Sequence, residues 1–284
     1  MATIPFCKFH GFGNDYIVIE RRSIPEAADL SELARAICHR HTGAGADGIA
    51  VVEPCAEAET DFFCEIVNPD GSIAGFSGNG TRCAVSYIHY KKLWNDPFLR
   101  LKTRSGVKSF RSIDGDPAGH YIFEAEIGQP KFASTDVPVK TPKPQESVID
   151  LPIGVLDREF AVSCVNVGNP VAITFVDDFG FDWRAYGKEL ETHPVFPQKA
   201  NIVFVKVADR ENIEIRIWER AAGETSSSGT CSSGAAVLAA FTHRTARKVS
   251  VHAVGGTTEF LWRDDDEILI TGRADLAFCG EWPG

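Results

Sequence analysis

Two serines lie at matching places in glycine- and serine-rich turns, where their hydroxyl groups could take part in proton transfer. Ser77 belongs to residues 74–83 (AGFSGNGTRC), and Ser228 belongs to residues 223–231 (GETSSSGTC), about half the chain further on. Small residues follow each turn, so each serine is expected just before the first residue of a helix. A helix N-terminus presents unpaired N–H groups and a partial positive charge, which bind carboxylates. Serine is also an ordinary N-cap residue, and the residues alone leave that alternative open.

Hydrophobic spacing predicts the helices that position these turns. Apolar residues recur with the spacing of one helical face over residues 30–39. Two further helices are expected directly after the glycine-rich turns, over about 80–93 and 229–247, and another over 181–192. The helices after the turns are rich in small residues, which suits elements packed on several sides.

Short runs of β-branched and aromatic residues, bounded by Gly, Pro, Asp or Asn, predict strands. They are residues 16–20, 49–52, 62–67, 98–102 and 121–126, then 160–165, 172–176, 202–207, 213–218, 250–254 and 268–271. Because a turn-and-helix unit recurs once, we expect two similar α+β halves. We place the boundary near Gly128, which gives residues 1–127 and 128–284, and the last strand could pack back on the first half.

Composition argues against several classes of function. The net charge of −10 disfavours a nucleic-acid-binding protein, which normally carries a basic face. No apolar run approaches the roughly 18 residues of a membrane span, and the first residues lack the apolar core of a signal peptide. A cytoplasmic protein is therefore expected. The eight cysteines show no C-x-x-C pair or zinc spacing, so we expect no metal site and free thiols that act as packing residues.

Six motifs, in order along the chain, resemble those of diaminopimelate epimerases. The first is residues 8–16 (KFHGFGNDY), and the second joins 68–72 (NPDGS) to 77–83 (SGNGTRC). The others are 166–170 (NVGNP), 193–197 (HPVFP) with 201–204 (NIVF), 219–220 (ER) with 223–230 (GETSSSGT), and 255–256 (GG) with 271–272 (TG). The resemblance therefore covers nearly the whole chain.

This resemblance implies an α+β fold of two halves related by a pseudo-twofold axis. Each half would curl a mixed or antiparallel β-sheet around a central helix, with the active site in the cleft between the halves. The family's reaction needs no metal or cofactor: one residue removes the α-proton of an amino acid while another delivers a proton to the opposite face. The implied activity interconverts LL- and meso-diaminopimelate, which are precursors of lysine and peptidoglycan. A homodimer is the family expectation.

The two positions that carry catalytic cysteines in the family carry Ser77 and Ser228 here. A thiol, with a reference pKa of about 8.5, suits proton transfer, whereas a serine hydroxyl needs another group to take its proton. Family members often support their cysteines with a His and a Glu. Val171 stands at the His position, which would leave Ser77 without that helper, while Glu219 would activate Ser228. Cys231 is a less favoured substitute thiol, because its use requires an insertion in a tight turn.

The family's binding residues are better retained than its proton-transfer pair. The resemblance places several asparagines on the substrate's polar groups and Arg220 on a carboxylate, to which it would donate two parallel hydrogen bonds. Backbone N–H groups at the two helix N-termini would also bind the substrate. The implied set is Asn14, Asn68, Gly78, Asn79, Asn169, Asn201, Glu219, Arg220, Gly229 and Thr230. The expected ligand is a zwitterionic amino acid.

Three functions fit these residues. The first is diaminopimelate epimerase activity, with Ser77, Ser228 and Glu219 as catalytic groups. The second is a same-fold isomerase or racemase that acts on another substrate. The third is a non-catalytic amino-acid-binding protein that has kept the binding groups and lost the acid–base pair. The retained binding groups favour the first two functions, and the loss of both thiols favours the last two.

Overall fold

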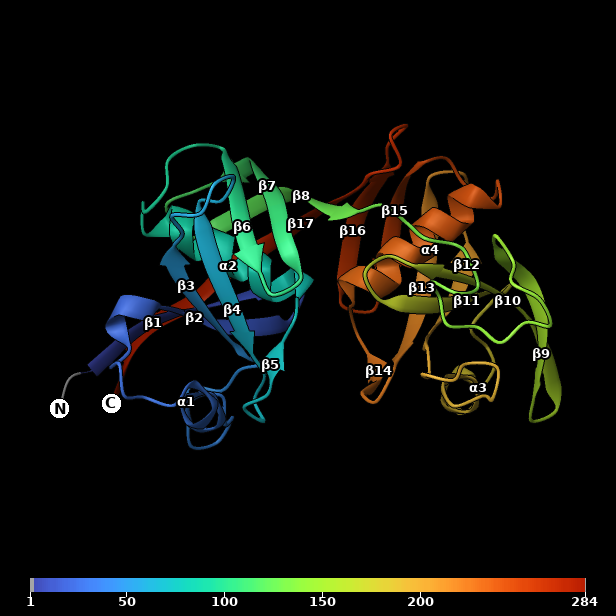
Figure 1. Ribbon diagram of the computed structural model, residues 1–284, viewed down its shortest axis with the longest axis horizontal. Helices are drawn as coiled ribbons and strands as arrows, with labels where there is room; N and C mark the ends of the chain where they lie inside the picture. The colour runs from blue at the N-terminus through green and yellow to red at the C-terminus, as the bar shows by residue number, and fades with distance from the viewer. Residues whose placement is uncertain (1–2, 284) are drawn as a thin grey trace. The chain divides into compact units, whose positions relative to one another are not determined.

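The computed structural model describes residues 3–283, and the chain divides into two compact units (Figure 1). Unit 1 comprises Met1–Glu126 with Thr271–Gly284, and unit 2 comprises Ile127–Ile270. The C-terminal segment therefore completes the unit that the N-terminal segment begins.

Unit 1 curls its strands around one central helix, α2 (Gly78–Tyr90), which packs against five of its strands. Residues 79–88 of this helix are all buried, because sheet surrounds it on several sides. The other elements are β1 (Thr3–Gly11), β2 (Asn14–Glu20), η1 (Arg21–Ser23), α1 (Leu30–Ile37), β3 (Ile49–Pro54), β4 (Phe62–Val67), β5 (Ile73–Ala74), β6 (Phe98–Thr103), β7 (Gly106–Gly115) and β8 (His120–Gly128).

Unit 2 has its own central helix, α4 (Gly229–Phe241), with residues 231–240 buried. Its other elements are β9 (Val148–Val155), β10 (Arg158–Asn166), β11 (Pro170–Phe175), α3 (Trp183–Glu191), β12 (Asn201–Val207), β13 (Asn212–Glu219), β14 (Gly223–Thr225), β15 (Lys248–Ala253) and β16 (Gly256–Trp262). The last strand, β17 (Ile268–Pro283), begins in unit 2 and continues through unit 1.

The two units repeat one order of strand pairings. In unit 1, β2 pairs parallel with β3, β3 antiparallel with β4, β4 antiparallel with β5 and parallel with β6, and β6 antiparallel with β7. In unit 2, the same sequence of pairings joins β11 to β12, β12 to β13, β13 to β14 and β15, and β15 to β16. The predicted α+β class and the predicted repeat are confirmed.

Both central helices end earlier than the sequence predicted. The helix expected to reach residue 93 ends at Tyr90, and the one expected to reach residue 247 ends at Phe241. In each case a left-handed residue follows closely, namely Lys92 with φ 55° and His243 with φ 59°. A residue in that conformation cannot continue the helix and commonly ends it.

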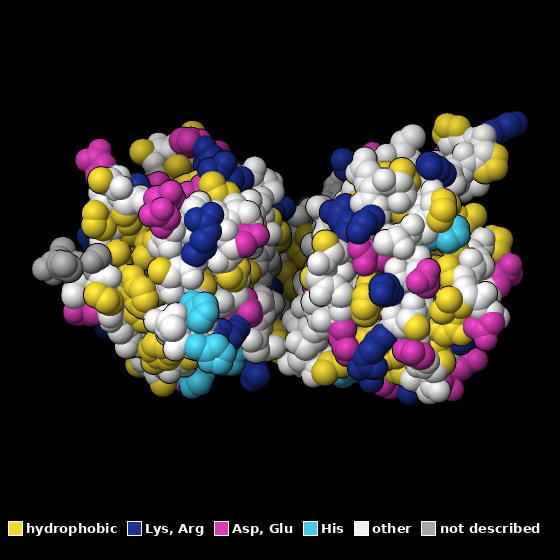
Figure 2. All heavy atoms as spheres, turned by 90° about the horizontal axis from the view of Figure 1, so that it is seen from below, with side chains coloured by type: hydrophobic (Ala, Val, Ile, Leu, Met, Phe, Trp, Pro, Cys, Tyr) yellow, Lys and Arg dark blue, Asp and Glu magenta, His cyan; other side chains and the backbone are white. Residues whose placement is uncertain are grey.

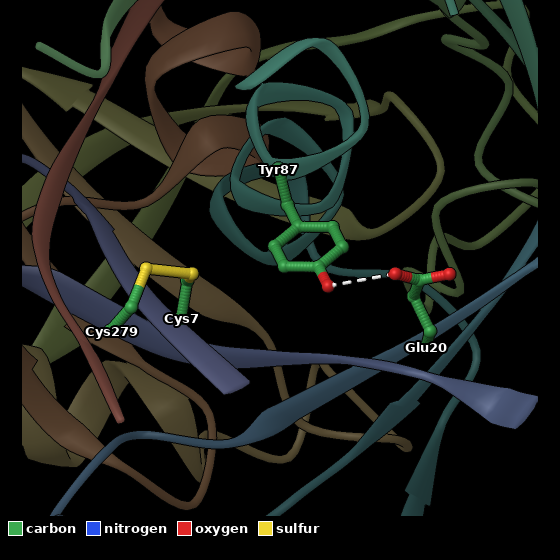
Figure 3. Close-up of a disulfide and its surroundings, with 4 residues drawn as sticks. All are labelled: Cys7, Glu20, Tyr87 and Cys279. Atoms are coloured by element: carbon green, nitrogen blue, oxygen red, sulfur yellow. Dashed lines mark hydrogen bonds between the residues drawn. A yellow bond between two sulfur atoms is a disulfide. The ribbon is translucent and has the colours of Figure 1, made fainter. Parts of the chain in front are cut away.

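The expectation that all cysteines are free thiols is wrong for one pair. Cys7 on β1 and Cys279 on β17 form a disulfide, shown in Figure 3. The two residues are direct partners in the antiparallel register of these strands, and their Cα atoms are 4.0 Å apart. A sequence separation of 272 residues gives no local signal of this pairing. Cys38, Cys55, Cys64, Cys83, Cys164 and Cys231 are free, and all except the half-buried Cys55 are buried.

On the face shown in Figure 2, basic side chains lie scattered among acidic and neutral ones. Within residues 3–283 no helix is long and apolar enough to cross a membrane.

Candidate active site

Ser77 is the N-cap of α2, as the sequence predicted. Its backbone is extended, with φ −139°, and its Oγ accepts the backbone N–H of Gly80 at 3.0 Å. The same oxygen lies 2.9 Å from the hydroxyl oxygen of Tyr16, in a hydrogen bond that either group is able to donate. Ser77 therefore has a helix N–H and a phenol as its neighbours.

Tyr16 is held in a slot between two glycines. A Cβ atom at Gly48 would lie 2.8 Å from Cε1 of the Tyr16 ring, and a Cβ at Gly80 would lie 3.0 Å from the same atom. Only glycine leaves room for the ring at both positions. Tyr16 is 6% exposed, and this burial raises the pKa of its hydroxyl to about 12, although the hydrogen bond with Ser77 opposes the shift.

Asn14 and Asn79 are joined to each other. The Asn79 side-chain amide donates to Asn14 Oδ1 at 3.1 Å, and the Asn14 amide donates to Asp47 Oδ2 at 2.8 Å. Arg82 donates a hydrogen bond to Asn79 Oδ1. The structure therefore brings these two predicted residues together, and their side chains brace the first turn of α2.

Arg82 is a buried cation that forms no ion pair with a carboxylate within residues 3–283. It is 2% exposed, and within residues 3–283 its Nε has no hydrogen-bond partner. Gly272 lies against the guanidinium, since a Cβ there would be 3.0 Å from Cζ. Burial lowers the pKa of Arg82 to about 10, which still leaves it charged at neutral pH. A positive charge therefore lies behind the N-terminus of α2.

Asp15 anchors the turn that carries Asn14. Its carboxylate accepts hydrogen bonds from both terminal nitrogens of Arg40, at 3.1 and 2.9 Å, and forms an ion pair with Lys8 at 2.7 Å. Burial favours the neutral form, but the hydrogen bonds from Arg40 and Lys8 outweigh it and lower the pKa of Asp15 to about 2. This charged cluster fixes one end of β2.

The hydrogen bonds of Asn68 lie within its own turn. Its side-chain amide donates to Ser72 Oγ at 3.0 Å, and its backbone N–H donates to the Ser72 carbonyl, which closes the turn 68–72. Among the hydrogen bonds of the described chain, none joins Asn68 to Asn14, Ser77 or Asn79. Its structural role in this unit is that of a turn residue.

Ser228 precedes α4 but does not cap it. Its backbone is extended, with φ −150°, and its side chain makes no cap hydrogen bond. Instead Ser228 Oγ donates to Glu219 Oε2 at 3.0 Å, while Thr225 Oγ1 donates to Glu219 Oε1 at 2.8 Å. Each carboxylate oxygen of Glu219 thus accepts a hydrogen bond from a hydroxyl group, which fixes the orientation of the carboxylate. The predicted pair of Ser228 and Glu219 is within hydrogen-bonding distance.

Arg220, Asn169 and Asn201 form a second linked group in unit 2. Asn201 is 2% exposed; its Oδ1 accepts the backbone N–H of Arg220 at 3.0 Å, and its amide donates to the Pro170 carbonyl at 2.8 Å. The Arg220 guanidinium donates to Asn169 Oδ1 at 3.4 Å and to the Gln198 carbonyl at 3.0 Å. Asn201 therefore positions Arg220 through the Arg220 backbone, because both the oxygen and the amide of the Asn201 side chain are already hydrogen-bonded within the protein.

The first residues of the two helices leave their backbone accessible. A Cβ atom at Gly78 would meet nothing closer than 3.9 Å, and the same holds at Gly229. Thr230, which follows Gly229, is half-buried. The first N–H groups of a helix have no partner within it, so these positions suit anion binding.

Cys231 and Val171 are core residues. Cys231 is fully buried, and burial together with the charge of Glu219 raises the pKa of its thiol, which makes it a poor proton acceptor. Val171 is also fully buried and packs against α4, because a Cβ at Gly234 would lie 3.2 Å from its own Cβ. The preference for Cys231 as a packing residue agrees with this burial.

Comparison with known proteins gives a consistent result. The family model described as diaminopimelate epimerase matches residues 6–130 and 163–277. The chain belongs to the diaminopimelate epimerase family. A protein of that name from Moorella thermoacetica is 37% identical over 283 residues, covering 98% of this chain and 99% of its own length. Another, from Caldanaerobacter subterraneus subsp. tengcongensis, is 38% identical over 277 residues, covering 97% and 98%.

Solved structures share the fold of this family member. A phenazine biosynthesis protein of the PhzF family from Bacillus anthracis matches with a TM-score of 0.71, covering all of both chains at 16% identity. At that identity the likeness concerns the fold alone. Among residues 3–283, no group of three or more His, Cys, Asp or Glu side chains is arranged to hold a metal ion.

Sequence reasoning missed three residues of these groups. Tyr16 and Arg82 lie inside motifs that were used only to recognise the family, and Thr225 lies in the turn before Ser228. Tyr16 is the last residue of the first motif and the first residue of the expected strand 16–20, so sequence reasoning gave it no role beyond the strand. Its link to Ser77 spans 61 positions and has no local signal.

Proposed function

We propose that this protein is a diaminopimelate epimerase-like isomerase that interconverts LL- and meso-diaminopimelate by proton transfer at one α-carbon. Ser77, Ser228 and Glu219 are the proposed catalytic residues. Full-length similarity to diaminopimelate epimerases supports the substrate, and it favours neither a different substrate nor a non-catalytic role. The same proposal places the reaction in the cytoplasm, in the synthesis of lysine and peptidoglycan precursors. A homodimer stays a prediction.

The observation that carries the mechanism is the hydrogen bond from Ser228 to Glu219. A serine hydroxyl becomes an effective base only when another group takes its proton. Ser228 Oγ would remove the α-proton of the substrate while its own proton passes to Glu219 Oε2, 3.0 Å away. Glu219 becomes a neutral acid, and the electron pair of the broken C–H bond remains on the α-carbon. Ser77 then donates a proton to the opposite face of that carbon.

Substrate binding is assigned to the remaining members of the predicted set. Arg220, held by Asn201 and Asn169, would bind a carboxylate with charged hydrogen bonds. The N–H groups of Gly78 and Asn79, and those of Gly229 and Thr230, would bind further oxygens of the amino acid and stabilise charge that develops during proton transfer. Asn14 would act by holding Asn79 in place.

Incubation of the purified protein with LL-diaminopimelate in deuterated water tests this proposal. Proton NMR is expected to show loss of the α-proton signal together with formation of the meso isomer. Glu219→Gln is the matched variant, because it keeps a hydrogen-bond acceptor for Ser228 but cannot take its proton. Binding without exchange would support an amino-acid-binding protein, and neither binding nor exchange would indicate another substrate.

A further inference from the structure

We propose that Tyr16 is the proton-relay partner of Ser77: it supplies the proton that Ser77 delivers to the substrate and recovers it in the reverse reaction. The two serines would then have different partners, a phenol for Ser77 and a carboxylate for Ser228. This inference rests on the proposed epimerase function and deepens it, because it gives Ser77 the helper that Val171 cannot provide.

The contacts of Ser77 leave its own hydrogen available. Its Oγ accepts the Gly80 N–H at 3.0 Å, and when Tyr16 donates at 2.9 Å both acceptor positions of the oxygen are used. The Ser77 hydrogen is then free to be given to a substrate. In this arrangement Ser77 acts as the acid toward the substrate, and the Tyr16 phenol is positioned to replace the proton that Ser77 gives up.

The slot around Tyr16 maintains this contact. The backbones of Gly48 and Gly80 both lie against the ring, since a Cβ atom added at either position would lie 2.8 or 3.0 Å from its Cε1. This close backbone contact restricts how far the ring can move its hydroxyl away from Ser77. Proton transfer requires donor and acceptor to stay within hydrogen-bonding distance, so the slot meets a condition of the relay.

The acidity of Tyr16 suits a proton donor. Because burial raises its pKa to about 12, the phenol is protonated at neutral pH. A phenol is nevertheless a stronger acid than an aliphatic hydroxyl, so it can restore the proton that Ser77 has given up.

The protons balance over one turnover. Glu219 gains the proton that Ser228 releases as it takes the α-proton, and the substrate regains a proton from Ser77. Tyr16 then passes its proton to Ser77 and is left ionised. The total charge is unchanged, and the reverse reaction or exchange with water restores both Tyr16 and Glu219.

The test is Tyr16→Phe in the full chain, assayed separately with LL- and meso-diaminopimelate in deuterated water. Epimerisation is expected to fall by about 100-fold or more, the contribution typical of a positioned proton donor. One of the two isomers should still exchange its α-proton without inversion, through Ser228 and Glu219. The other isomer should lose exchange, because its proton must be taken by Ser77.

Tyr87→Phe is the matched control. Tyr87 is also buried in unit 1, at 3% exposure, and its hydroxyl donates to Glu20 at 3.1 Å (Figure 3). Loss of that hydroxyl removes a comparable buried hydrogen bond, so the thermal unfolding midpoint of Tyr87→Phe should fall by about as much as that of Tyr16→Phe. Proton exchange and inversion by Tyr87→Phe should stay at the level of the unmodified protein.

Two further variants protect the test against a folding effect. Gly80→Ala keeps the Tyr16 hydroxyl but displaces its ring, and it should give the same one-sided loss of exchange. In a Ser77→Ala background, Tyr16→Phe should cause no additional loss, since Tyr16 acts through Ser77. Two results for Tyr16→Phe would overturn the relay. One is an epimerisation rate within about threefold of that of the unmodified protein, and the other is an equal loss of α-proton exchange for both isomers. If the unmodified protein exchanges neither isomer, the proposed function fails instead.

Discussion

The two serines occupy equivalent places in the repeated topology, yet their hydroxyl groups have opposite surroundings. Ser77 caps its helix and lies beside two groups that can donate hydrogen bonds, the Gly80 N–H and the Tyr16 hydroxyl. Ser228 leaves its helix uncapped and donates to the carboxylate of Glu219. Both units of the repeat therefore have a serine directly before the central helix, but the two hydroxyls have different hydrogen-bond partners.

The charge behind each serine differs in sign as well. Within residues 3–283 the buried Arg82 of unit 1 forms no ion pair with a carboxylate, whereas in unit 2 Ser228 Oγ donates a hydrogen bond to the carboxylate of Glu219. A positive charge favours loss of a proton from a neighbouring group, and a negative charge opposes it. This comparison supports the proposal that unit 1 donates a proton and unit 2 accepts one.

The largest effect is expected from Glu219→Gln. Glutamine cannot take the Ser228 proton, so the turnover number should fall by about 100- to 10,000-fold, the range typical of general acid–base groups. The assay is epimerisation of LL-diaminopimelate. Thr225→Val, which removes only the hydrogen bond to Glu219 Oε1, is the milder companion variant. Comparable losses in the two variants would mean that Glu219 acts by position and not by accepting a proton.

A gain of activity is expected when cysteine replaces both serines. With a reference pKa of about 8.5, a thiol exchanges protons near neutral pH far more readily than a hydroxyl, and a gain of about 100-fold is expected. The measurement is the turnover number of Ser77→Cys/Ser228→Cys under reducing conditions. An unchanged rate would show that the surroundings of positions 77 and 228 no longer suit the family's thiol chemistry.

A smaller effect, on stability alone, is expected from the disulfide of unit 1. Cys7→Ser/Cys279→Ser should lower the free energy of unfolding by about 2–4 kcal/mol, because the cross-link joins β1 to the final strand. Denaturant unfolding with and without a reducing agent measures this change. If the midpoint is the same in all conditions, the bond contributes nothing to the stability of unit 1.

The smallest effect concerns the anchor of Asn14 in unit 1. The pKa of Asp15 is about 2 in the folded chain, against about 3.9 for an ordinary aspartate. The ionised Asp15 therefore contributes on the order of 2 kcal/mol to the free energy of unfolding. This contribution is complete above about pH 4 and is lost as the pH falls toward 2. The stability difference between the unmodified protein and Asp15→Asn should shrink over that interval. The exposed Asp177→Asn serves as the control, and a difference independent of pH would contradict this assignment.

Sequence reasoning recovered the elements that have a strong local signal. Residues 30–39 have helical apolar spacing, and α1 occupies Leu30–Ile37 with Asp29 as its cap. The glycine-rich turns before α2 and α4 were recognisable because their composition is unusual and repeated. The hydrogen bond between Ser228 and Glu219 spans only nine residues, so the motif around it was informative.

Features that depend on distant parts of the chain were not recoverable in this way. The strand β17 was expected to end near residue 271 and instead continues to Pro283, because β1 pairs with it along most of that length. The strands β1 and β7 were missed because polar residues interrupt their alternation. The sequence predicted Glu219 as the partner of Ser228, but it gave no signal for the partner of Ser77, because Tyr16 lies 61 positions away.

The most direct measurement of this difference is the pKa of a thiol placed at each position in turn. Ser77→Cys and Ser228→Cys would be titrated separately through the pH dependence of their alkylation by iodoacetamide, with the unmodified protein as the baseline for Cys55. The account predicts a lower pKa at position 77, beside hydrogen-bond donors and near Arg82, than at position 228, beside the Glu219 carboxylate. Equal values, or a lower value at position 228, would contradict the assignment of donor and acceptor roles to the two units.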